Sequence, residues 1–360
     1  MSVANWVKER FPTDRTHLDA AAAGRVSSAV LELETQHLRE EAIRGAYVAE
    51  ALAADMIDAG RAALGSLVGL GGGDTFYSDG AGTAFAVLLH AWPLAPGSRI
   101  GTITGEYGGN ARFLRDRAAL KGWELVQLPV DDLGRLLEVP SDLDLVTFPQ
   151  VLSQRGIAQP VELALASGVP LVLDVAQSAG QTEVPPGAAA YVGTSRKWLC
   201  GPRGVGWGCV APEWQSRLAD PPTLGPAHHL GRFARYDSSE PHVAGRVGLA
   251  HAARTWSPAL LPVVQAAASA ARVLLEGAGG WHVIEPVDEP TGITTLWHET
   301  ADPFAVRAAL VDRGFVVSVV PTSRADDMTR PVLRVSTAAW VTPGDVGTLS
   351  EALDSLGSSA

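Results

Sequence analysis

Cysteine is scarce in this sequence of 360 residues, which contains only Cys200 and Cys209. Two thiols cannot build a disulfide framework, and no further cysteine stands at the spacing of a zinc site. The two could pair with each other, but a reduced pair in a cytoplasmic protein is the interpretation we favour. The low count argues against the class of small secreted domains that disulfides hold together.

A net positive charge and long apolar runs are also missing. The 28 lysines and arginines are outnumbered by 39 acidic residues, which gives a net charge of -11 and a pI near 5.3. This balance argues against nucleic acid or an anionic membrane as a partner, although a local basic cluster could still bind a small anion. The segment Met1–Arg10 has no apolar signal core, and no stretch of about 18 uncharged apolar residues predicts a membrane span. We therefore expect a cytoplasmic protein that acts on a small molecule.

The sequence does contain a regular alternation of apolar runs and helical segments. Its length suffices for one large core and a smaller second domain. Helices are predicted over residues 27–68, 83–92, 111–121 and 161–167, and strands over 99–104, 124–130, 143–148, 169–175, 188–194 and 205–210. Buried apolar runs that alternate with helices indicate an α/β fold with a mostly parallel sheet covered on both faces.

A second, smaller α/β domain is predicted at the C-terminal end. A loop rich in glycine, proline and histidine at 221–245 precedes a helical stretch broken at Pro258 and Pro262. Strands are then expected at 292–297, 315–320 and 332–336, and helices at 303–313 and 343–356. We assign the large domain to residues 16–245 and the small domain to residues 246–360, with residues 1–15 packing on the small domain.

The most informative stretch is 194–206, Thr-Ser-Arg-Lys-Trp-Leu-Cys-Gly-Pro-Arg-Gly-Val-Gly, in which Lys197 precedes a glycine–proline turn. A lone lysine beside a hairpin would be an ordinary surface residue. Here Asp174 lies 23 residues upstream, at the end of the apolar run 169–173. Pyridoxal phosphate needs both partners, because a lysine forms a Schiff base with its aldehyde and a carboxylate keeps the pyridine nitrogen protonated. Lys197 is the candidate catalytic residue, and Asp174 the candidate partner of the ring.

Further candidates fall where strands end, which is where ligands gather in open α/β sheets. Gly80, Ala81, Gly82 and Thr83 precede a helix and could bind the cofactor phosphate, or could simply begin that helix. Tyr107, after another strand, could stack on the pyridine ring or pack at the strand end.

The turn that follows Asp174 and a polar strand residue of the small domain supply the remaining candidates. Gln177 could donate to the ring hydroxyl, and Ser153 is a weaker candidate there; Asp174 itself could instead cap a helix. Arg334 lies in an otherwise apolar strand, so it needs a partner, either a substrate carboxylate or an internal acid. His228 and His229 are adjacent in a polar loop without acidic ligands, so we predict no metal site.

These motifs make the chain resemble the class V, fold-type I family of pyridoxal-phosphate enzymes, over nearly its whole length. The resemblance is carried by residues 18–22 (Leu-Asp-Ala-Ala-Ala), the Asp174…Gln177 turn and the Lys197…Gly204 segment. Residues 106–110 (Glu-Tyr-Gly-Gly-Asn) together with 195–206 resemble the ergothioneine-biosynthesis branch, the hercynylcysteine sulfoxide lyases. The family likeness implies a seven-stranded type of large-domain sheet, a homodimer with sites near the interface, and Thr194 among the cofactor contacts. Arg196 stands where desulfurases usually have a histidine; we count it among the cofactor contacts, where it could bind the phosphate, and a substrate contact is the alternative.

The branch likeness implies a β-elimination that releases the sulfur of a cysteine conjugate, with pyruvate and ammonia as the other products. Desulfurases of the family carry a catalytic cysteine just before the arginine strand of the small domain, and residues 319–330 hold no cysteine. A protein-bound persulfide is therefore not expected. Another class V enzyme, such as an aminotransferase or a lyase of a different conjugate, and a non-catalytic binding protein with this fold remain alternatives.

Overall fold

The large sheet of the protein has seven strands. In the computed structural model, which describes residues 1–221 and 234–357, its order is β2-β8-β7-β6-β5-β3-β4. The strands are β2 (Thr75–Ser78), β8 (Gly206–Val210), β7 (Ala190–Thr194), β6 (Leu171–Asp174), β5 (Leu145–Pro149), β3 (Arg99–Thr102) and β4 (Glu124–Gln127). Neighbouring strands from β7 to β4 are parallel, and β8 runs antiparallel to both β7 and β2. The predicted α/β fold with a mostly parallel sheet is confirmed.

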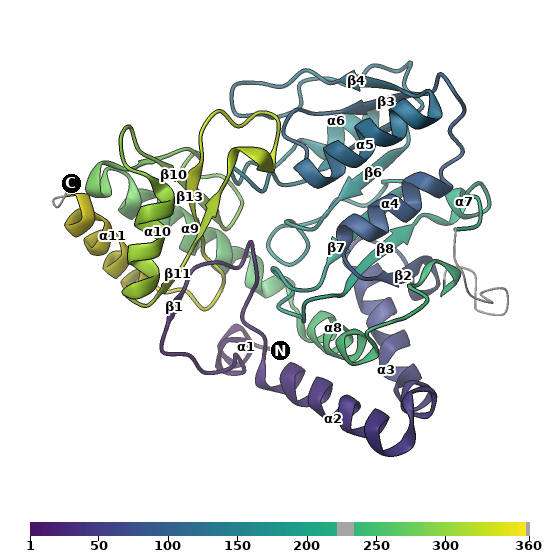
Figure 1. The fold of residues 1–360 in the computed structure, drawn as a ribbon, viewed down its shortest axis with the longest axis horizontal. Helices are drawn as coiled ribbons and strands as arrows, with labels where there is room; N and C mark the ends of the chain where they lie inside the picture. Colours follow the sequence, from purple (N-terminus) through teal and green to yellow (C-terminus); the bar gives the residue numbers. More distant parts are fainter. Residues whose placement is uncertain (222–233, 358–360) are drawn as a thin grey trace.

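Helices cover both faces of this sheet, because its central strands are buried on both sides. Along β6, Leu171 and Leu173 face one core, together with residues of α3 (Ala46–Ser66) and α8 (Val243–Thr255). Val172 faces the other core, together with α4 (Ala81–Ala91) and α5 (Gly108–Lys121). The sheet with its helices forms the right-hand body in Figure 1, and α6 (Val161–Ala166) and α7 (Pro212–Gln215) complete it.

Two parts of this body differ from the sequence prediction. The helix expected over 27–68 is two helices, α2 (Ser28–Arg44) and α3, because Gly45 adopts a φ of 90° that ends the first one. Strand β2 was not predicted at all. Its Thr-Phe-Tyr-Ser sequence is short and has a polar residue at each end, so the run of apolar side chains that marks the other strands is absent.

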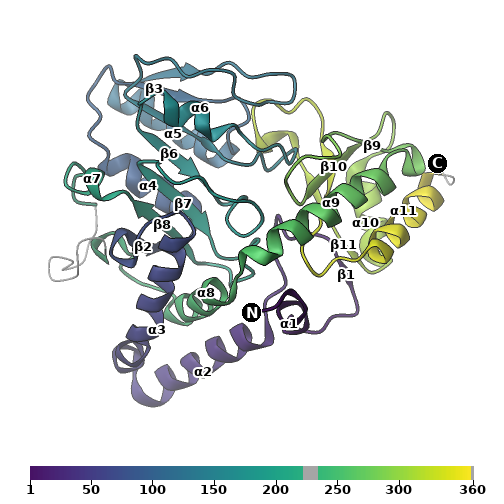
Figure 2. The same cartoon turned by 180° about the vertical axis from the view of Figure 1, so that it is seen from behind.

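A four-stranded antiparallel sheet forms the core of the C-terminal body. Its order is β12 (Ser318–Val320), β13 (Val332–Ser336), β10 (Ile293–Trp297) and β9 (His282–Val283), with α9 (Leu261–Leu275), α10 (Pro303–Asp312) and α11 (Pro343–Gly357) beside it. Figure 2 shows α9 running from α8 into this body.

The N-terminal segment also packs against the C-terminal body. Strand β1 (Thr16–His17) pairs in parallel with β11 (Phe315–Val316). Trp6 of α1 (Val3–Lys8) stacks on Trp340, with ring centroids 6.0 Å apart.

The predicted boundary at residue 245 falls inside α8. Val247 and Leu249 of this helix belong to the core under the large sheet, whereas Leu260 belongs to the core of the C-terminal body. We therefore keep the division into two domains as a proposal, and place the change of body after α8.

One stretch, Pro258–Leu275, is long and apolar enough to cross a membrane, with a mean hydropathy of 1.5. Its apolar character has a local use, because Val264, Ala268 and Leu275 pack in the core of the C-terminal body. The buried guanidinium of Arg272 in the same helix donates to the carbonyl oxygens of Glu289 at 2.7 Å and Ile293 at 2.9 Å. The composition is that of a core helix.

Candidate active site

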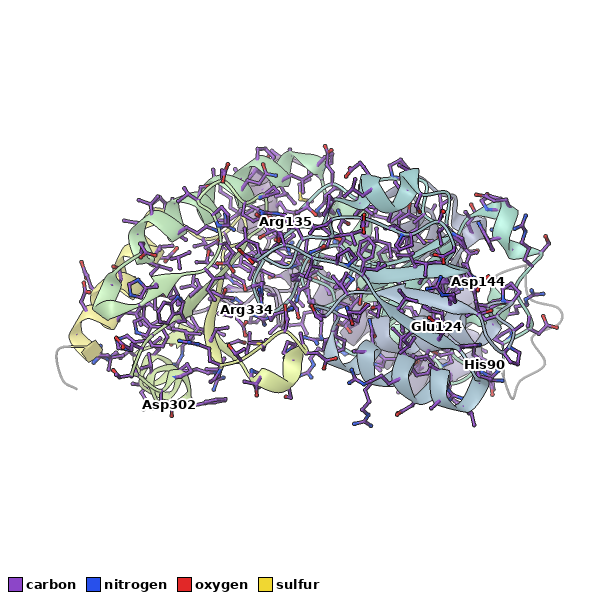
Figure 3. All side chains as sticks on the ribbon, turned by 90° about the horizontal axis from the view of Figure 1, so that it is seen from above. His90, Glu124, Arg135, Asp144, Asp302 and Arg334 are labelled. Atoms are coloured by element: carbon purple, nitrogen blue, oxygen red, sulfur yellow. The ribbon has the colours of Figure 1, made fainter. Side chains whose placement is uncertain are left out.

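A pocket of about 310 Å³ lies where the C-terminal ends of the large-sheet strands face the C-terminal body. Arg334, labelled near the middle of the molecule in Figure 3, reaches the pocket from strand β13. The pocket brings together these residues predicted from the sequence: Gly80, Ala81, Gly82, Tyr107, Ser153, Asp174, Gln177, Thr194, Arg196, Lys197 and Arg334. Thr83 is not among its lining residues; it lies one turn into α4.

Lys197 sits in the turn that connects β7 to β8, the antiparallel pair at one side of the sheet. The turn is held by its own backbone, since the amide of Cys200 donates to the Lys197 carbonyl at 3.1 Å. The N-terminal segment fixes it from outside, because the Gly24 amide donates to the Arg196 carbonyl at 2.7 Å. Burial lowers the pKa of Lys197 to about 7, against the opposing charge of Asp174. A substantial share of this amine is therefore neutral near pH 7, as nucleophilic attack on an aldehyde requires.

Asp174 ends strand β6 with both carboxylate oxygens engaged. Its Oδ1 accepts a hydrogen bond from the Ala176 amide at 2.8 Å, and its Oδ2 accepts one from Asn110 Nδ2 at 3.0 Å. Burial raises the pKa of Asp174, while the charge of Lys197 and these hydrogen bonds oppose that rise. The bond to Ala176 is the local turn that any aspartate after a strand could make. The bond to Asn110 is specific to this site.

Asn110 and Glu106 belong to the site and were not singled out from the sequence. Asn110 lines the pocket from the first turn of α5, and its Nδ2 also lies 3.2 Å from Glu106 Oε1. Glu106 is buried, and its second oxygen has no hydrogen-bond partner among the described residues. Burial, and then the charge of Asp174, raise the pKa of Glu106 to about 8. Both residues stand in the quoted 106–110 motif, and their spacing of four on a helix start could have indicated that they face one another.

The glycine loop, residues 80–82, lies at the start of α4, and Gly80 is the N-cap residue of this helix. Strand β8 crosses close to this loop: a Cβ at Gly206 would come within 2.3 Å of the Gly80 carbonyl carbon. Any side chain at position 206 would push the loop out of place, so the glycine of β8 fixes it. Gly80 and Gly82 border open space, and the N-terminus of α4 is a favourable place for a phosphate.

Three further pocket residues differ in how many protein contacts their side chains already make: Tyr107, Ser153 and Gln177. Tyr107 is 40% exposed, so part of its side chain is accessible to a ligand in the pocket. Ser153 Oγ is buried and has no partner within the described parts of the chain. Gln177 is engaged at both ends, donating to the Ala21 carbonyl at 3.0 Å and accepting from Trp198 Nε1 at 2.9 Å. One amide hydrogen of Gln177 remains for a ligand.

Arg334 has protein partners as well as a place in the pocket. It is 3% exposed, donates to the Ser153 carbonyl at 2.9 Å, and has its Nη2 3.6 Å from Asp19 Oδ1. Burial lowers the pKa of Arg334 to about 10, and Asp19 opposes that shift. Asp19 is thus the internal acid that the sequence analysis gave as one alternative for Arg334. The 3.6 Å between Arg334 Nη2 and Asp19 Oδ1 is too long for a close bidentate pair, so N–H donors of Arg334 remain for a substrate carboxylate. His228 and His229 lie outside the described residues.

No protein-family model matches the chain. A protein of Mycobacterium tuberculosis named "Probable hercynylcysteine sulfoxide lyase" is 36% identical over 97% of this chain and 92% of its own length. Among solved structures, a cysteine desulfurase of Thermococcus onnurineus covers 100% of the chain and 99% of its own, with a TM-score of 0.86 at 18% identity. The desulfurase CsdA of Escherichia coli covers 99% of the chain and 98% of its own, with a TM-score of 0.85 at 18% identity.

The chain therefore belongs to the class V, fold-type I family of pyridoxal-phosphate-dependent enzymes. Its activity is that of a carbon–sulfur lyase of this family.

The residues of the pocket fit the family's cofactor. Pyridoxal phosphate needs an amine for its aldehyde, an acid for its ring nitrogen and donors for its phosphate and hydroxyl. Lys197 and Asp174 supply the first two, and the start of α4 supplies amide donors for the phosphate. The unpartnered Ser153 Oγ and the remaining amide hydrogen of Gln177 are available to the ring hydroxyl. No described group conflicts with this placement.

Proposed function

We propose that this lyase acts on hercynylcysteine sulfoxide, breaking its Cβ–S bond to give a sulfenate together with pyruvate and ammonia; an external two-electron reductant then converts the sulfenate to ergothioneine. The observation that carries the proposal is the 36% identity, over nearly the full length of both chains, to the mycobacterial relative of that name. It is supported by a pocket that holds Lys197, Asp174 and Arg334 together.

The chain's own residues account for the steps around the reacting carbon. Arg334 holds the α-carboxylate of the substrate with the donors that Asp19 leaves free. Asp174 would accept the ring N–H of the cofactor, and Asn110 orients that carboxylate through its hydrogen bond. Pyridoxal phosphate, when bound, supplies the electron sink that stabilises negative charge at Cα.

Lys197 takes the proton from Cα, and the sulfur then leaves Cβ with the bonding electron pair. The amine suits this role, because its pKa near 7 lets it accept a proton and return it under the same conditions. A sulfoxide leaves as a sulfenate, a weaker base than a thiolate, so it needs no acceptor cysteine.

The two thiols of the chain do not offer such an acceptor. Cys200 and Cys209 are buried, and neither lines the pocket. Burial raises the pKa of Cys200 to about 11 and that of Cys209 to about 12, so both are protonated thiols near neutral pH. Elimination without a protein persulfide is the mechanism we propose.

We further propose that the enzyme is a cytoplasmic homodimer with its sites near the interface. The support is a set of large apolar side chains exposed on α2 and α3, two helices in the lower part of Figure 1: Leu31, Leu38, Ile43, Tyr47, Val48 and Leu52. A second copy packed on these helices would remove them from water. An Ile43→Glu variant should shift the molar mass in light scattering from two chains to one, and an unchanged mass would refute this interface.

The function is tested by turnover of the cofactor-loaded enzyme. Hercynylcysteine sulfoxide should yield pyruvate and ammonia in equal amounts, and the corresponding thioether should react more slowly. An amino-acid product formed only after addition of a keto acid would identify an aminotransferase. Turnover of other cysteine conjugates alone would identify a different lyase. Absence of any turnover, with the cofactor bound, would identify a binding protein.

A further inference from the structure

The segment 321–330 of the C-terminal body pairs its acidic residues away from the pocket. Asp326 accepts a hydrogen bond from Arg115 Nη1 at 2.5 Å. Asp327 lies 2.9 Å from Arg155 Nη2. Arg324 stands between the strand β12 and these two acids, yet it forms no ion pair with any described residue, and it lines the pocket. The two carboxylates of this segment therefore lie outside the pocket, whereas the guanidinium of Arg324 lines it.

The position of Arg324 is fixed by close packing between the two bodies. Its guanidinium lies over the Tyr107 ring, 5.5 Å from the centroid. Next to it, the Ser323 carbonyl oxygen approaches α5 so closely that a Cβ at Gly108 would come within 2.6 Å of it. A glycine at the start of α5 is what allows this approach. The backbone of residues 323 and 324 is therefore packed against the start of α5, and the Arg324 side chain lines the pocket.

The pocket contains more arginine than its described acids neutralise. Arg334 has Asp19 nearby, whereas Arg196 donates to the Ala22 carbonyl and forms no ion pair among the described residues. With Arg324 this leaves two partly buried guanidinium groups without a carboxylate. A partly buried charge is costly unless a ligand or partner pairs with it.

Of the three arginines that lower the pKa of Lys197, Arg324 has the smallest effect. Three arginines lower the pKa of Lys197, and their contributions decrease in the order Arg196, Arg334, Arg324. Arg334 is 3% exposed, whereas Arg324 is only half-buried, so Arg324 lies on the more solvent-accessible side of the pocket. The α-carboxylate of a substrate, one bond from the reacting carbon, belongs with Arg334, and Arg324 is left for a more distant group.

We propose that Arg324, supported by the Tyr107 ring, forms a subsite for a second anionic group carried on the sulfur substituent of the substrate. The substrate class is then a cysteine S-conjugate with a carboxylate beyond the sulfur. This inference rests on the proposed lyase function, whose substrate carries a carboxylate on its histidine-derived part. Arg324 sets specificity among conjugates and takes no part in the chemistry at Cα.

The test compares two substrates that differ only in the terminal group of the sulfur substituent. S-(2-carboxyethyl)-L-cysteine sulfoxide has a distal carboxylate, and S-propyl-L-cysteine sulfoxide has a methyl group in its place. For the holoenzyme, Arg324→Gln should lower kcat/KM for the carboxylated conjugate about tenfold or more, mainly through KM, and leave that for the propyl conjugate unchanged. Arg324→Lys should recover part of the loss, because the charge remains while the planar fork is gone.

Arg330→Gln is the matched control. Arg330 lies on the same segment, with its guanidinium 5.0 Å from the Trp297 ring centroid and outside the pocket. In this variant kcat/KM should equal the wild-type value for both conjugates. Equal losses for the two conjugates in Arg324→Gln would show that Arg324 holds the α-carboxylate or the cofactor. No loss for either would also overturn the subsite.

A binding measurement separates this inference from the proposed function. Calorimetric titration of the holoenzyme with the thioethers S-(2-carboxyethyl)-L-cysteine and S-propyl-L-cysteine should show tighter binding of the first. That preference should disappear in Arg324→Gln. If it holds while hercynylcysteine sulfoxide gives no pyruvate, the substrate proposal fails and the subsite stands. If wild type binds both thioethers equally, the subsite fails whatever the enzyme turns over.

Discussion

Asn110 donates a hydrogen bond to Asp174 at 3.0 Å from the same nitrogen that lies 3.2 Å from Glu106. One amide group thus bridges two buried carboxyl groups, each taking one of its two hydrogens. Two carboxylates this close and this deeply buried would repel each other, which is one reason why the pKa of Glu106 is raised, and the amide fixes the orientation of Asp174. Asn110 lines the pocket, and Glu106 behind it belongs to the same hydrogen-bonded group.

The first prediction concerns this bridge. Asn110→Ala should leave the fold intact but free the Asp174 carboxylate to rotate, so turnover should fall about tenfold or more and the absorption maximum of the bound cofactor should shift. Steady-state kinetics and the visible spectrum measure the two effects. A variant with lower thermal stability, but with the wild-type spectrum and turnover, would reduce Asn110 to a packing residue.

Glu106 should make stability depend on pH. Its pKa is raised in the folded protein to about 8, so the folded state holds a proton that the unfolded chain releases above its ordinary value of 4.5. The stability contributed by this proton is complete below pH 4.5 and is lost as the pH rises through 8. Glu106→Gln should therefore weaken the decline of the unfolding free energy between pH 5 and 8, by at most about 1.4 kcal/mol per pH unit. Urea titrations across this range measure it, with Glu32→Gln on the exposed face of α2 as the control.

Lys197→Ala should abolish the lyase reaction. The variant loses both the amine that binds the aldehyde and the base that removes the Cα proton, and the base alone accounts for about a hundredfold or more in rate. The absorption band of the lysine-bound cofactor should vanish while the circular dichroism spectrum persists. Lys121→Ala, at the exposed end of α5, is the control. An unchanged band and rate in Lys197→Ala would refute the assignment.

Two variants can decide whether Arg334 binds the substrate carboxylate or only forms an internal pair with Asp19. Arg334→Ala should raise KM sharply with the cofactor spectrum unchanged, because losing one partner of a buried charge pair costs about 2–5 kcal/mol. Asp19→Asn removes the competing acid and should leave KM the same or lower it. A normal KM in Arg334→Ala, with reduced thermal stability in both variants, would mean that the arginine serves the internal pair alone.

The thiols should be dispensable. Cys200 has no room to react, since a Cβ at Gly24 would come within 2.6 Å of its sulfur, and Cys209 Sγ lies 3.1 Å from Thr75 Oγ1. Each Cys→Ser variant should therefore retain substantial lyase activity, and mass spectrometry of the enzyme during turnover should detect no added sulfur. A trapped persulfide on either residue, or a folded, cofactor-loaded variant without activity, would return the mechanism to the desulfurase type.

Asp174 and Lys197, which the structure brings into one pocket, could be singled out from the sequence because each follows from a local pattern. An apolar run that ends in an acid places Asp174 at the tip of a buried strand, and a glycine–proline turn after Lys197 holds the lysine between two strands. The edge strand β2 and the break at Gly45 were missed for the converse reason. The apolar run of β2 is too short to predict a strand. The break between α2 and α3 depends on the positive φ of Gly45 alone, inside an otherwise continuous helical pattern.

The sequence by itself determined the alternation of strands and helices and the residues that stand at the strand ends, since both depend on neighbours along the chain. Only the tertiary structure decided which distant residues meet there. Asn110 reaches Asp174 across 64 positions, and Arg334 reaches the Ser153 carbonyl across 181. Arg324 enters the pocket because its neighbouring acids find arginines on the large domain. Such pairings depend on how the two bodies pack against each other, and no local pattern encodes that packing.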